Sequence, residues 1–462
     1  MTAMQFIWTM IKILIMVGFV LNLAAILTWA DRRQSSMIQD RIGPNRAVVK
    51  IFGKEFRLAG LLHPAADGLK FFTKEDFMPP RADRLLFTLA PIMAMGMVFT
   101  LVGTIPFGDT VCPRLFHLHL VAHWPIIEGP SAQRWGTCSP DVKNGLYPIE
   151  LMVAPLGAGI LYVFAMSGQG IIAAAIAGWS SDNKFSLLGA LRAASQMVSY
   201  EVTLGMSLIG AMMIYGTVRL DEMVRWQDNH AWGIFVQPLA FVLFFTAAVA
   251  ENKRIPFDLP EAESELVSGY FTEYAGMKFG MFYFAEYAEV VTGSMLLVTI
   301  FLGGWTLPFF HRDGLTIEFG TLRLLQIPVS HVWMTLLGVL TFFVKVILVC
   351  WMQVFVRWTL PRFRYDQLMK LGWRMLLPAS LANILVTGVV WLALDKAGPG
   401  VSDALKVAGD LSQAIVAGVL AFLVGSLVIG FFAPIKHLRT LLGSSAEVTA
   451  KRGGTKSEPM QA

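Results

Sequence analysis

Charged residues are scarce in this sequence. Only 15% of its 462 residues are Asp, Glu, Lys or Arg, 55% are hydrophobic, and the mean hydropathy is +0.59. An ordinary soluble domain is about one-quarter charged, and a chain this apolar could not cover its surface with polar groups in water. The composition therefore excludes the soluble, disordered and nucleic-acid-binding classes. The net charge of +5 is too small to indicate a polyanionic partner.

Cysteines are also few. Cys112, Cys138 and Cys350 are too few and too widely spaced to hold an iron–sulfur cluster. Cys350 falls in an apolar stretch, which indicates inert packing. Cys112 and Cys138 lie with three histidines in the connecting segment 105–148. The orientation predicted below places this segment on the outer, oxidising side of a membrane, so a disulfide between the two cysteines is left open. No cysteine or carboxylate spacing supports a metal site there, so we predict none.

A nucleotide-binding loop is missing too. The nearest match to G-x-G-x-x-G is Gly168-x-Gly170-x-x-Ala173, which lies inside an apolar run of helix length. Small residues at this spacing are typical of close helix packing in membranes, whereas a dinucleotide site needs a strand before the loop and a helix after it. We expect helix packing here.

Long apolar runs dominate the rest of the sequence. About 20 apolar residues in a helix span the roughly 30 Å of hydrocarbon in a bilayer, and backbone groups in lipid must bond internally, which favours helices over strands. Nine stretches fit: 5–30, 85–106, 149–177, 190–216, 234–251, 282–306, 334–357, 373–394 and 411–434. The sequence thus predicts an all-α polytopic membrane protein with about nine transmembrane helices.

Basic residues are distributed unevenly between the two sides of the predicted membrane. Of the 37 Lys and Arg residues, 26 lie in alternate connections and 9 in the opposite set. The richer connections are 31–84, 178–192, 251–281, 357–374 and 435–462. By the positive-inside tendency these are cytoplasmic. The N-terminus is then outside and the C-terminus inside.

Two of the basic connections carry helix signals. Apolar residues within 62–72 recur at i, i+3, i+4 and i+7, which predicts an amphipathic helix that opens near Pro64 and is stopped by the prolines at 79–80. Such a helix could lie at the membrane surface. In the second connection, Asp258 begins a capping pattern that predicts a helix of about ten residues ending at Gly269.

The most informative residues are carboxylates at membrane depth, because a charge there is costly and usually serves a function. Glu201, Glu251, Glu286 and Glu289 lie within or at the end of apolar stretches, and the last two share one helix face. The connection between the fifth and sixth stretches adds further acids, among them Glu261, Glu263 and Glu265.

Clustered carboxylates alter each other's protonation. Two like charges about 4 Å apart, at an effective dielectric near 20, repel by roughly 4 kcal/mol, which equals about three pKa units. Some members of such a cluster would hold protons at neutral pH, and the set would form a proton relay that responds to a new charge nearby. The alternative is that the connection acids form a solvated face and the buried acids make isolated ion pairs.

Four longer blocks resemble one known family. They are DRRQSSMIQDRIGPNRA (31–47), GLLHPAADGLKFFTKEDFMPP (60–80), ASQMVSYEV (194–202) and AENKRIPFDLPEAESELVSGYFTEYAGMKFGMFYFAEYAE (250–289). These blocks are similar to signature segments of the H subunit of bacterial NADH:quinone oxidoreductase, respiratory complex I, whose mitochondrial counterpart is NADH dehydrogenase subunit 1.

The resemblance implies a membrane-arm subunit of a proton-translocating enzyme, without catalysis by the chain alone, that helps form the ubiquinone cavity. It places the following residues along the quinone passage: Arg32, Gln39, Arg41, Asp67, Lys70, Arg254, Phe257 and Asp258. It makes the following glutamates the proton relay into the membrane arm: Glu201, Glu251, Glu261, Glu263, Glu265, Glu286 and Glu289.

The resemblance also implies a setting for the chain. Ubiquinone is the substrate, and FMN and the iron–sulfur clusters belong to partner subunits. The partners are the peripheral quinone-module subunits, neighbouring membrane-arm subunits and lipid, with no nucleic acid. The location is the bacterial inner membrane, where the distribution of basic residues makes the N-terminus periplasmic and the C-terminus cytoplasmic.

The sequence departs from the family pattern in places. Asp31 stands where the family usually has Glu, and the connection 105–148 is enlarged. Residues 395–462 add a transmembrane helix and a basic cytoplasmic tail to the eight-helix core at 1–394.

We hypothesise that quinone reduction shifts the protonation of the acids between 251 and 289 and so drives proton translocation. Three alternatives stay open. The first is a related subunit of an energy-converting hydrogenase, against which the blocks at 31–47 and 250–289 argue. The second is a self-sufficient transporter, which predicts an inverted repeat, and no repeat is obvious. The third is a passive anchor, in which the buried glutamates are dispensable.

Overall fold

The computed structural model describes residues 3–41, 43–44, 47, 49–51, 54–56, 60–111, 149–259, 267–311, 314–319, 322–329, 331–396 and 407–419. The chain divides into two compact units, 1–412 and 413–462. Of the second unit, the structure describes only residues 413–419, which are helical. Apart from the helix at Val407–Val419, which reaches into the second unit, everything that follows concerns the first unit.

Seven helices in the described part of the chain are long and apolar enough to cross a membrane. They are α1 (Ala3–Ile38), α3 (Arg84–Thr104), α4 (Gly159–Ser180), α5 (Lys184–Tyr215), α10 (Gly276–Phe301), α11 (His331–Thr359), and a continuous helix formed by α12 (Tyr365–Lys370), the π-helical turn η5 (Leu371–Leu376) and α13 (Leu377–Lys396). The all-α polytopic class is therefore confirmed.

The predicted count of nine is not confirmed. Two of the nine stretches form shorter apolar helices within the described residues: α8 (Pro238–Glu251) has 14 residues, and the helix at Val407–Val419 is described no further. The fifth stretch falls short because α7 (Gly233–Val236) ends before Gln237, its C-cap, and Pro238 begins a separate helix. Proline fits the first turn of a helix but disrupts a helix interior.

Short elements fill the connections. They are α2 (His63–Thr73), α6 (Leu220–Asn229), the 3-10 turn η4 (Gly269–Phe271), the antiparallel pair β1 (Val49–Ile51) and β2 (Lys54–Phe56), and a three-stranded antiparallel sheet of β3 (Phe310–His311), β4 (Gly314–Phe319) and β5 (Leu322–Pro328). In the larger sheet Leu315 pairs with Ile327.

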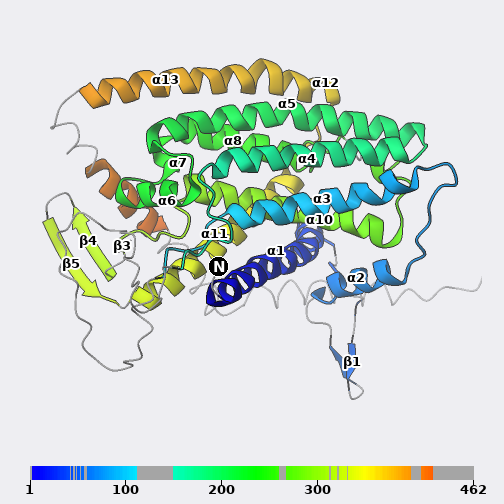
Figure 1. Cartoon of the computed structure of the whole chain (residues 1–462), viewed down its shortest axis with the longest axis horizontal. Helices are drawn as coiled ribbons and strands as arrows, with labels where there is room; N and C mark the ends of the chain where they lie inside the picture. Colours follow the sequence, from blue (N-terminus) through cyan, green and yellow to red (C-terminus); the bar gives the residue numbers. More distant parts are fainter. Residues whose placement is uncertain are drawn as a thin grey trace, which may run out of the picture. The chain divides into compact units, whose positions relative to one another are not determined.

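The helices of the bundle pack in an order that Figure 1 shows. α3 packs against α4, α4 against α5, and α5 against both α8 and α13, while α10 contacts α1, α3 and α11. In the most apolar 18-residue stretch of each helix, 83% of α10 is buried within the chain, against 28% of α1 and 22% of Tyr365–Leu394. α10 is therefore the central helix, and α1 and the α12–α13 helix expose apolar sides to lipid or to partners.

Small residues allow α4 and α5 to approach closely. Ala174 and Ala177 of α4 and Ala190 and Ala193 of α5 share one buried cluster. Gly170, from the G-x-G segment, is also buried in α4, and a Cβ there would lie 2.8 Å from Met97 Sδ of α3. The prediction that this segment serves helix packing is confirmed.

The predicted amphipathic helix is confirmed as α2, with a proline in its first turn. Its end was predicted wrongly: α2 stops at Thr73, ahead of the prolines at 79–80, because the chain becomes extended at Lys74. The predicted helix after Asp258 lies largely outside the described residues. The pair Cys112 and Cys138 also lies outside them.

Candidate functional site: a buried row of glutamates beside two cations

Glu286 and Glu289 lie in the central helix α10, with only 4% and 9% of their surfaces exposed. Each faces a cation from the segment that follows α8. The Arg254 Nη2 atom lies 3.2 Å from Glu286 Oε2, and the Lys253 Nζ atom lies 3.8 Å from Glu289 Oε2. Both cations are themselves buried. Pairing compensates the cost of removing these charges from water.

The segment that carries the two cations is fixed by a buried amide from another helix. Gln196 of α5 donates from Nε2 to the carbonyls of Ala250 and Phe257, each at 2.8 Å. The chain turns sharply between these two points because Lys253 adopts a left-handed conformation with φ +54°. Gln196 thereby holds both ends of the turn that presents Lys253 and Arg254 to α10.

A second polar chain holds the same turn from the other side. Asn252 Nδ2 donates to Gln353 Oε1 at 3.0 Å, and Gln353 Nε2 donates to Ser294 Oγ at 3.0 Å. Cys350 Sγ also donates to Ser294 Oγ, at 3.2 Å. Cys350 is buried and has a free thiol, which agrees with the packing role expected from sequence.

The row continues through two further glutamates. Glu251 ends α8, which packs against α5, the helix of Glu201, and against α10, the helix of Glu289. Glu201 is half-buried in α5, and Ser167 of α4 donates a 2.9 Å hydrogen bond to its Oε1 atom. The structure thus brings together four of the seven glutamates named from sequence: Glu286, Glu289, Glu251 and Glu201. The other three, Glu261, Glu263 and Glu265, lie outside the described residues.

Aromatic hydroxyls extend the network at the Glu286 end. Tyr270 Oη donates to Glu286 Oε1 at 3.2 Å. The guanidinium of Arg254 lies over the ring of Tyr287, with 4.1 Å between its Cζ atom and the ring centroid. Tyr287 Oη in turn donates to Asp31 Oδ2 at 2.7 Å. The acidic row is therefore connected, through Arg254 and Tyr287, to the end of α1.

Asp31 belongs to this network although the sequence marked it only as a departure from a family pattern. Its carboxylate is buried and also accepts hydrogen bonds from Arg357 and, at 3.2 Å, from Trp358 Nε1. The sequence nevertheless carried a signal. Asp31 and Arg357 each stand at the end of a long apolar run, so the ends of two spanning helices can bring this acid and this base within reach of each other.

The residues assigned to the quinone passage fall into three groups in the structure. At the end of α1 and on α2, Arg32 Nη2 lies 2.6 Å from Asp67 Oδ2, and both side chains are partly exposed. Lys70, exposed on α2, belongs to this first group. The second group follows the end of α1, where Arg41 Nε donates to Gln39 Oε1 at 2.6 Å.

The third group is formed by Arg254, Phe257 and Asp258, which lie within or next to the turn beside the acidic row. Phe257 is buried between the rings of Tyr200 and Phe363, with centroids at 5.8 and 5.6 Å. Asp258 forms an ion pair with Arg362. α2 contacts both α1 and α10, so the exposed residues on α2 lie next to the helix that carries Glu286.

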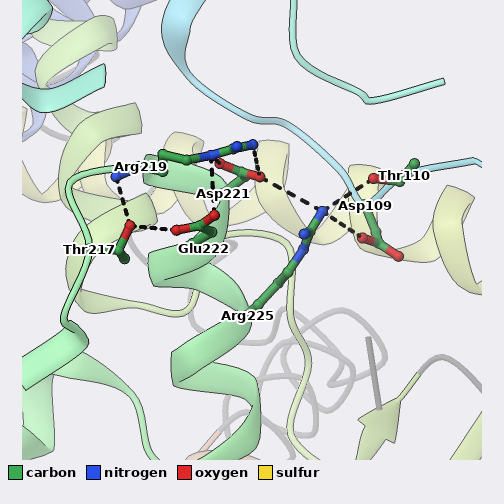
Figure 2. A network of polar contacts seen from close by, with 7 residues as sticks. All are labelled: Asp109, Thr110, Thr217, Arg219, Asp221, Glu222 and Arg225. Atoms are coloured by element: carbon green, nitrogen blue, oxygen red, sulfur yellow. Dashed lines mark hydrogen bonds and ion pairs between the residues drawn. The ribbon is translucent and has the colours of Figure 1, made fainter. Parts of the chain in front are cut away.

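A separate charge network, which no sequence pattern predicted, ties α6 to the segment after α3 (Figure 2). Arg219 donates to both oxygens of Asp221, at 3.2 and 3.0 Å, and Asp221 raises the pKa of the Arg219 guanidinium. Arg225 Nη2 lies 3.8 Å from Asp221 Oδ2 and 3.8 Å from Asp109 Oδ1. These ion pairs hold α6 against the segment after α3.

Two lysines inside the long helices serve the backbone. Lys345 of α11 is buried and donates from Nζ to the carbonyls of Leu302, Gly304 and Thr306, at 2.7, 3.1 and 2.6 Å. These carbonyls follow the end of α10, where a cation is favoured by the helix dipole. Lys12 donates to Met152 O at 2.8 Å.

The fold and these contacts define a polytopic α-helical membrane protein with paired charges buried around one central helix. Residues 11–388 match the NADH dehydrogenase family, and the chain belongs to that family. The resemblance seen in the sequence blocks is thereby confirmed.

Relatives with high coverage agree, and all three named here are H subunits of an NADH-quinone oxidoreductase. The chain is 39% identical over 368 residues to the H subunit numbered 1 of Cytophaga hutchinsonii, covering 80% of this chain and 92% of that protein. It is 40% identical over 365 residues to the H subunit of Flavobacterium psychrophilum, covering 79% and 91%. It is 39% identical over 381 residues to the H subunit numbered 1 of Geobacter sulfurreducens, covering 82% and 93%.

Proposed function

We propose that this chain is a membrane-arm subunit of a proton-translocating NADH:quinone oxidoreductase. In this role it helps form the cavity for ubiquinone and couples quinone reduction to proton movement through its buried glutamates. The observation that carries the proposal is the buried pair Glu286 and Glu289 in α10, each facing a cation, with Glu251 and Glu201 on the packed helices α8 and α5.

The chemistry follows from charge. Reduction of a quinone by two electrons creates a demand for two protons and adds negative charge until they arrive. In a low-dielectric setting such a charge shifts the proton affinity of neighbouring carboxyls. Moving one charge against 100 mV takes about 2.3 kcal/mol, which a shift of about two pKa units supplies at 1.36 kcal/mol each. A row of interacting acids passes the shift along because each member responds to its neighbour.

In this proposal the quinone passage runs over the exposed group on α1 and α2 toward Arg254. The pair of Arg32 and Asp67, together with Lys70, supports its entrance, and Phe257 and Asp258 support its inner end. Arg254 is the link to the acidic row because it contacts both Glu286 and Tyr287.

The remaining parts of the enzyme belong to other chains. We place FMN and the iron–sulfur clusters in partner subunits, and the partners in both the peripheral quinone module and the membrane arm. The location is the bacterial inner membrane, with the N-terminus periplasmic and the C-terminus cytoplasmic. The excess of basic residues in alternate connections supports this orientation.

The test is Glu201→Gln in the assembled complex. The substitution keeps the side-chain shape and can still accept the hydrogen bond of Ser167, but removes the ionisable proton. We expect NADH:quinone turnover and proton pumping to fall together by about a hundredfold or more, the range in which proton-transfer groups contribute. Both rates would be measured in proteoliposomes from purified complex of verified subunit content.

The control is Glu222→Gln, which removes the same charge from a partly exposed glutamate in α6. It should leave both rates near those of the unmodified complex. Unchanged rates in Glu201→Gln would remove this residue from the relay. Unchanged rates in Gln variants of Glu201, Glu286 and Glu289 alike would favour the passive-anchor function.

A further inference from the structure

A cavity of about 480 Å³ opens between the start of α3 and the connection from α4 to α5. Five of its lining residues bear on what it can bind: Arg81, Asp182, Asn183, Lys184 and Glu273. We propose that this cavity binds the zwitterionic headgroup of a membrane phospholipid with a primary ammonium group, of the phosphatidylethanolamine type. This inference is independent of the proposed proton relay.

The cavity lies at headgroup depth in the bilayer. Three membrane-length helices begin or end around it: α3 begins at Arg84, α4 ends at Ser180 and α5 begins at Lys184. The ends of such helices lie at the boundary between hydrocarbon and headgroups. The cavity is therefore at the level where a phospholipid presents its phosphate and ammonium groups.

The lining of the cavity carries charges of both signs. Arg81 and Lys184 are exposed and form no ion pair with any acid in the described part of the chain. They can donate to a phosphate. Asp182 and Glu273 supply the opposite sign, and Asn183 Nδ2 fixes Glu273 Oε1 by a 2.6 Å hydrogen bond. The lining thus offers two cations and two carboxylates.

This balance selects among headgroups. A purely anionic headgroup would gain from the two cations but would face two carboxylates. Phosphatidylcholine would match both signs, but its quaternary ammonium has no N–H to donate to Glu273. A primary ammonium donates up to three hydrogen bonds, so a phosphatidylethanolamine satisfies the cations through its phosphate and the carboxylates through its amine.

An exposed apolar surface beside the cavity offers a path for the acyl chains. Large apolar side chains stand exposed about one helical turn or less from the cavity: Leu85 on α3 (71% exposed), Trp179 on α4 (72%) and Leu188 on α5 (49%). Tryptophan is favoured at the headgroup level of bilayers. A lipid whose headgroup fills the cavity can lay its chains along this apolar surface.

The experiment uses the purified, assembled complex in phosphatidylcholine liposomes that contain a trace of phosphatidylethanolamine with a diazirine in its acyl chain. After illumination, crosslinked peptides are identified by mass spectrometry. We expect labelling at 79–85 and 179–188. Unlabelled phosphatidylethanolamine should reduce this labelling, whereas phosphatidylcholine, phosphatidylglycerol and inorganic phosphate should compete far less well.

Variants separate the two halves of the site. Arg81→Gln combined with Lys184→Gln should lower the labelling about tenfold or more, since two charge-assisted hydrogen bonds are lost. Glu273→Gln should keep labelling but lose the preference for phosphatidylethanolamine over phosphatidylcholine. Lys370→Gln is the matched control, because Lys370 is exposed near the start of another long helix, α12–α13, away from the cavity lining. It should label as the unmodified complex does.

Three results would overturn the proposal. Labelling that is unaffected in the double variant would show that the cations do not bind the lipid. Stronger competition by phosphatidylglycerol would show an anionic site instead. Absence of labelling in the intact complex would show that a partner subunit, not lipid, covers the cavity. Subunit content of each variant complex is verified first, so that none of these results reflects failed assembly.

Discussion

At the scale of single residues, Arg254 connects the acidic row to its surroundings. It lies 3.2 Å from Glu286, stacks on Tyr287 and belongs to the turn held by Gln196. Its planar guanidinium serves both contacts at once, because it can donate along its edge while its face lies on an aromatic ring. A lysine could supply the charge without this geometry.

Replacing Arg254 should therefore damage the fold as well as the function. Arg254→Met leaves Glu286 buried without its cation, and breaking a buried pair in this way costs about 3–5 kcal/mol. We expect a lower temperature for heat-induced loss of this subunit from the complex, with a smaller decrease for Arg254→Lys. The measurement is a thermal series on purified complex, read by subunit content.

The comparison is Arg364→Met, which removes an arginine from an exposed position. It should leave the thermal series near that of the unmodified complex. Equal effects of the two methionine substitutions would contradict the idea that burial and pairing make Arg254 important.

The sequence predicted that Glu286 and Glu289 are buried, but not which bases face them, and it did not predict the burial of Asp31 or Asp221. Glu286 and Glu289 stand out because they interrupt an apolar run, and that is visible without a structure. Their partners Lys253 and Arg254 come from a turn whose position depends on Gln196 of α5 and Asn252. Such long-range contacts follow from tertiary packing, which no local periodicity encodes.

At the scale of elements, the contact between α5 and η4 is the tightest that bears on the site. Gly189 of α5 lies against the 3-10 turn, and a Cβ there would be 2.7 Å from Gly269 Cα and 2.8 Å from Tyr270 N. Both neighbours are backbone atoms and cannot rotate away. The absence of a side chain at Gly189 therefore sets the position of Tyr270, which donates to Glu286.

Gly189→Ala should displace η4 and weaken the hydrogen bond from Tyr270 to Glu286. Overpacking of this kind costs about 1–3 kcal/mol, against a gain in helix propensity of at most about 1 kcal/mol. We expect reduced thermal stability and a lower quinone-linked rate in the same variant, measured on purified complex.

The matched substitution is Gly96→Ala in α3, where a Cβ would meet nothing within 4 Å. This variant should be as stable as the unmodified complex or slightly more so. If Gly96→Ala is destabilised, or if Gly189→Ala is fully stable, the close approach of α5 and η4 does not make a side chain at position 189 destabilising.

Element boundaries were the least predictable part of the fold. The apolar stretch at 234–251 predicted one spanning helix, but the chain breaks at Gln237 and leaves α8 with 14 residues. Hydropathy averages over such a break, whereas Pro238 marks it. The existence of the long helices was predictable because each satisfies the length and composition that a bilayer demands.

At the scale of the whole molecule, buried charges occur in separate sets with different partners. Around α10, Glu286 and Glu289 lie on one helix and face Arg254 and Lys253, with Glu251 and Glu201 on the helices that pack nearby. In the network of Figure 2 each arginine faces carboxylates at close range, which fixes the charges. Under the proposed function the first set is the relay, whereas the second holds α6 against the segment after α3.

If the first set is a relay, its carboxyls must change their protonation when quinone is reduced. Infrared difference spectroscopy of the assembled complex detects such a change, by comparing oxidised and NADH-reduced states in the presence of ubiquinone. We expect a carboxyl signal that is diminished in Glu286→Gln and in Glu289→Gln and retained in Glu222→Gln. A carboxyl signal that is identical in all three variants and in the unmodified complex would show that the buried row does not take part in coupling.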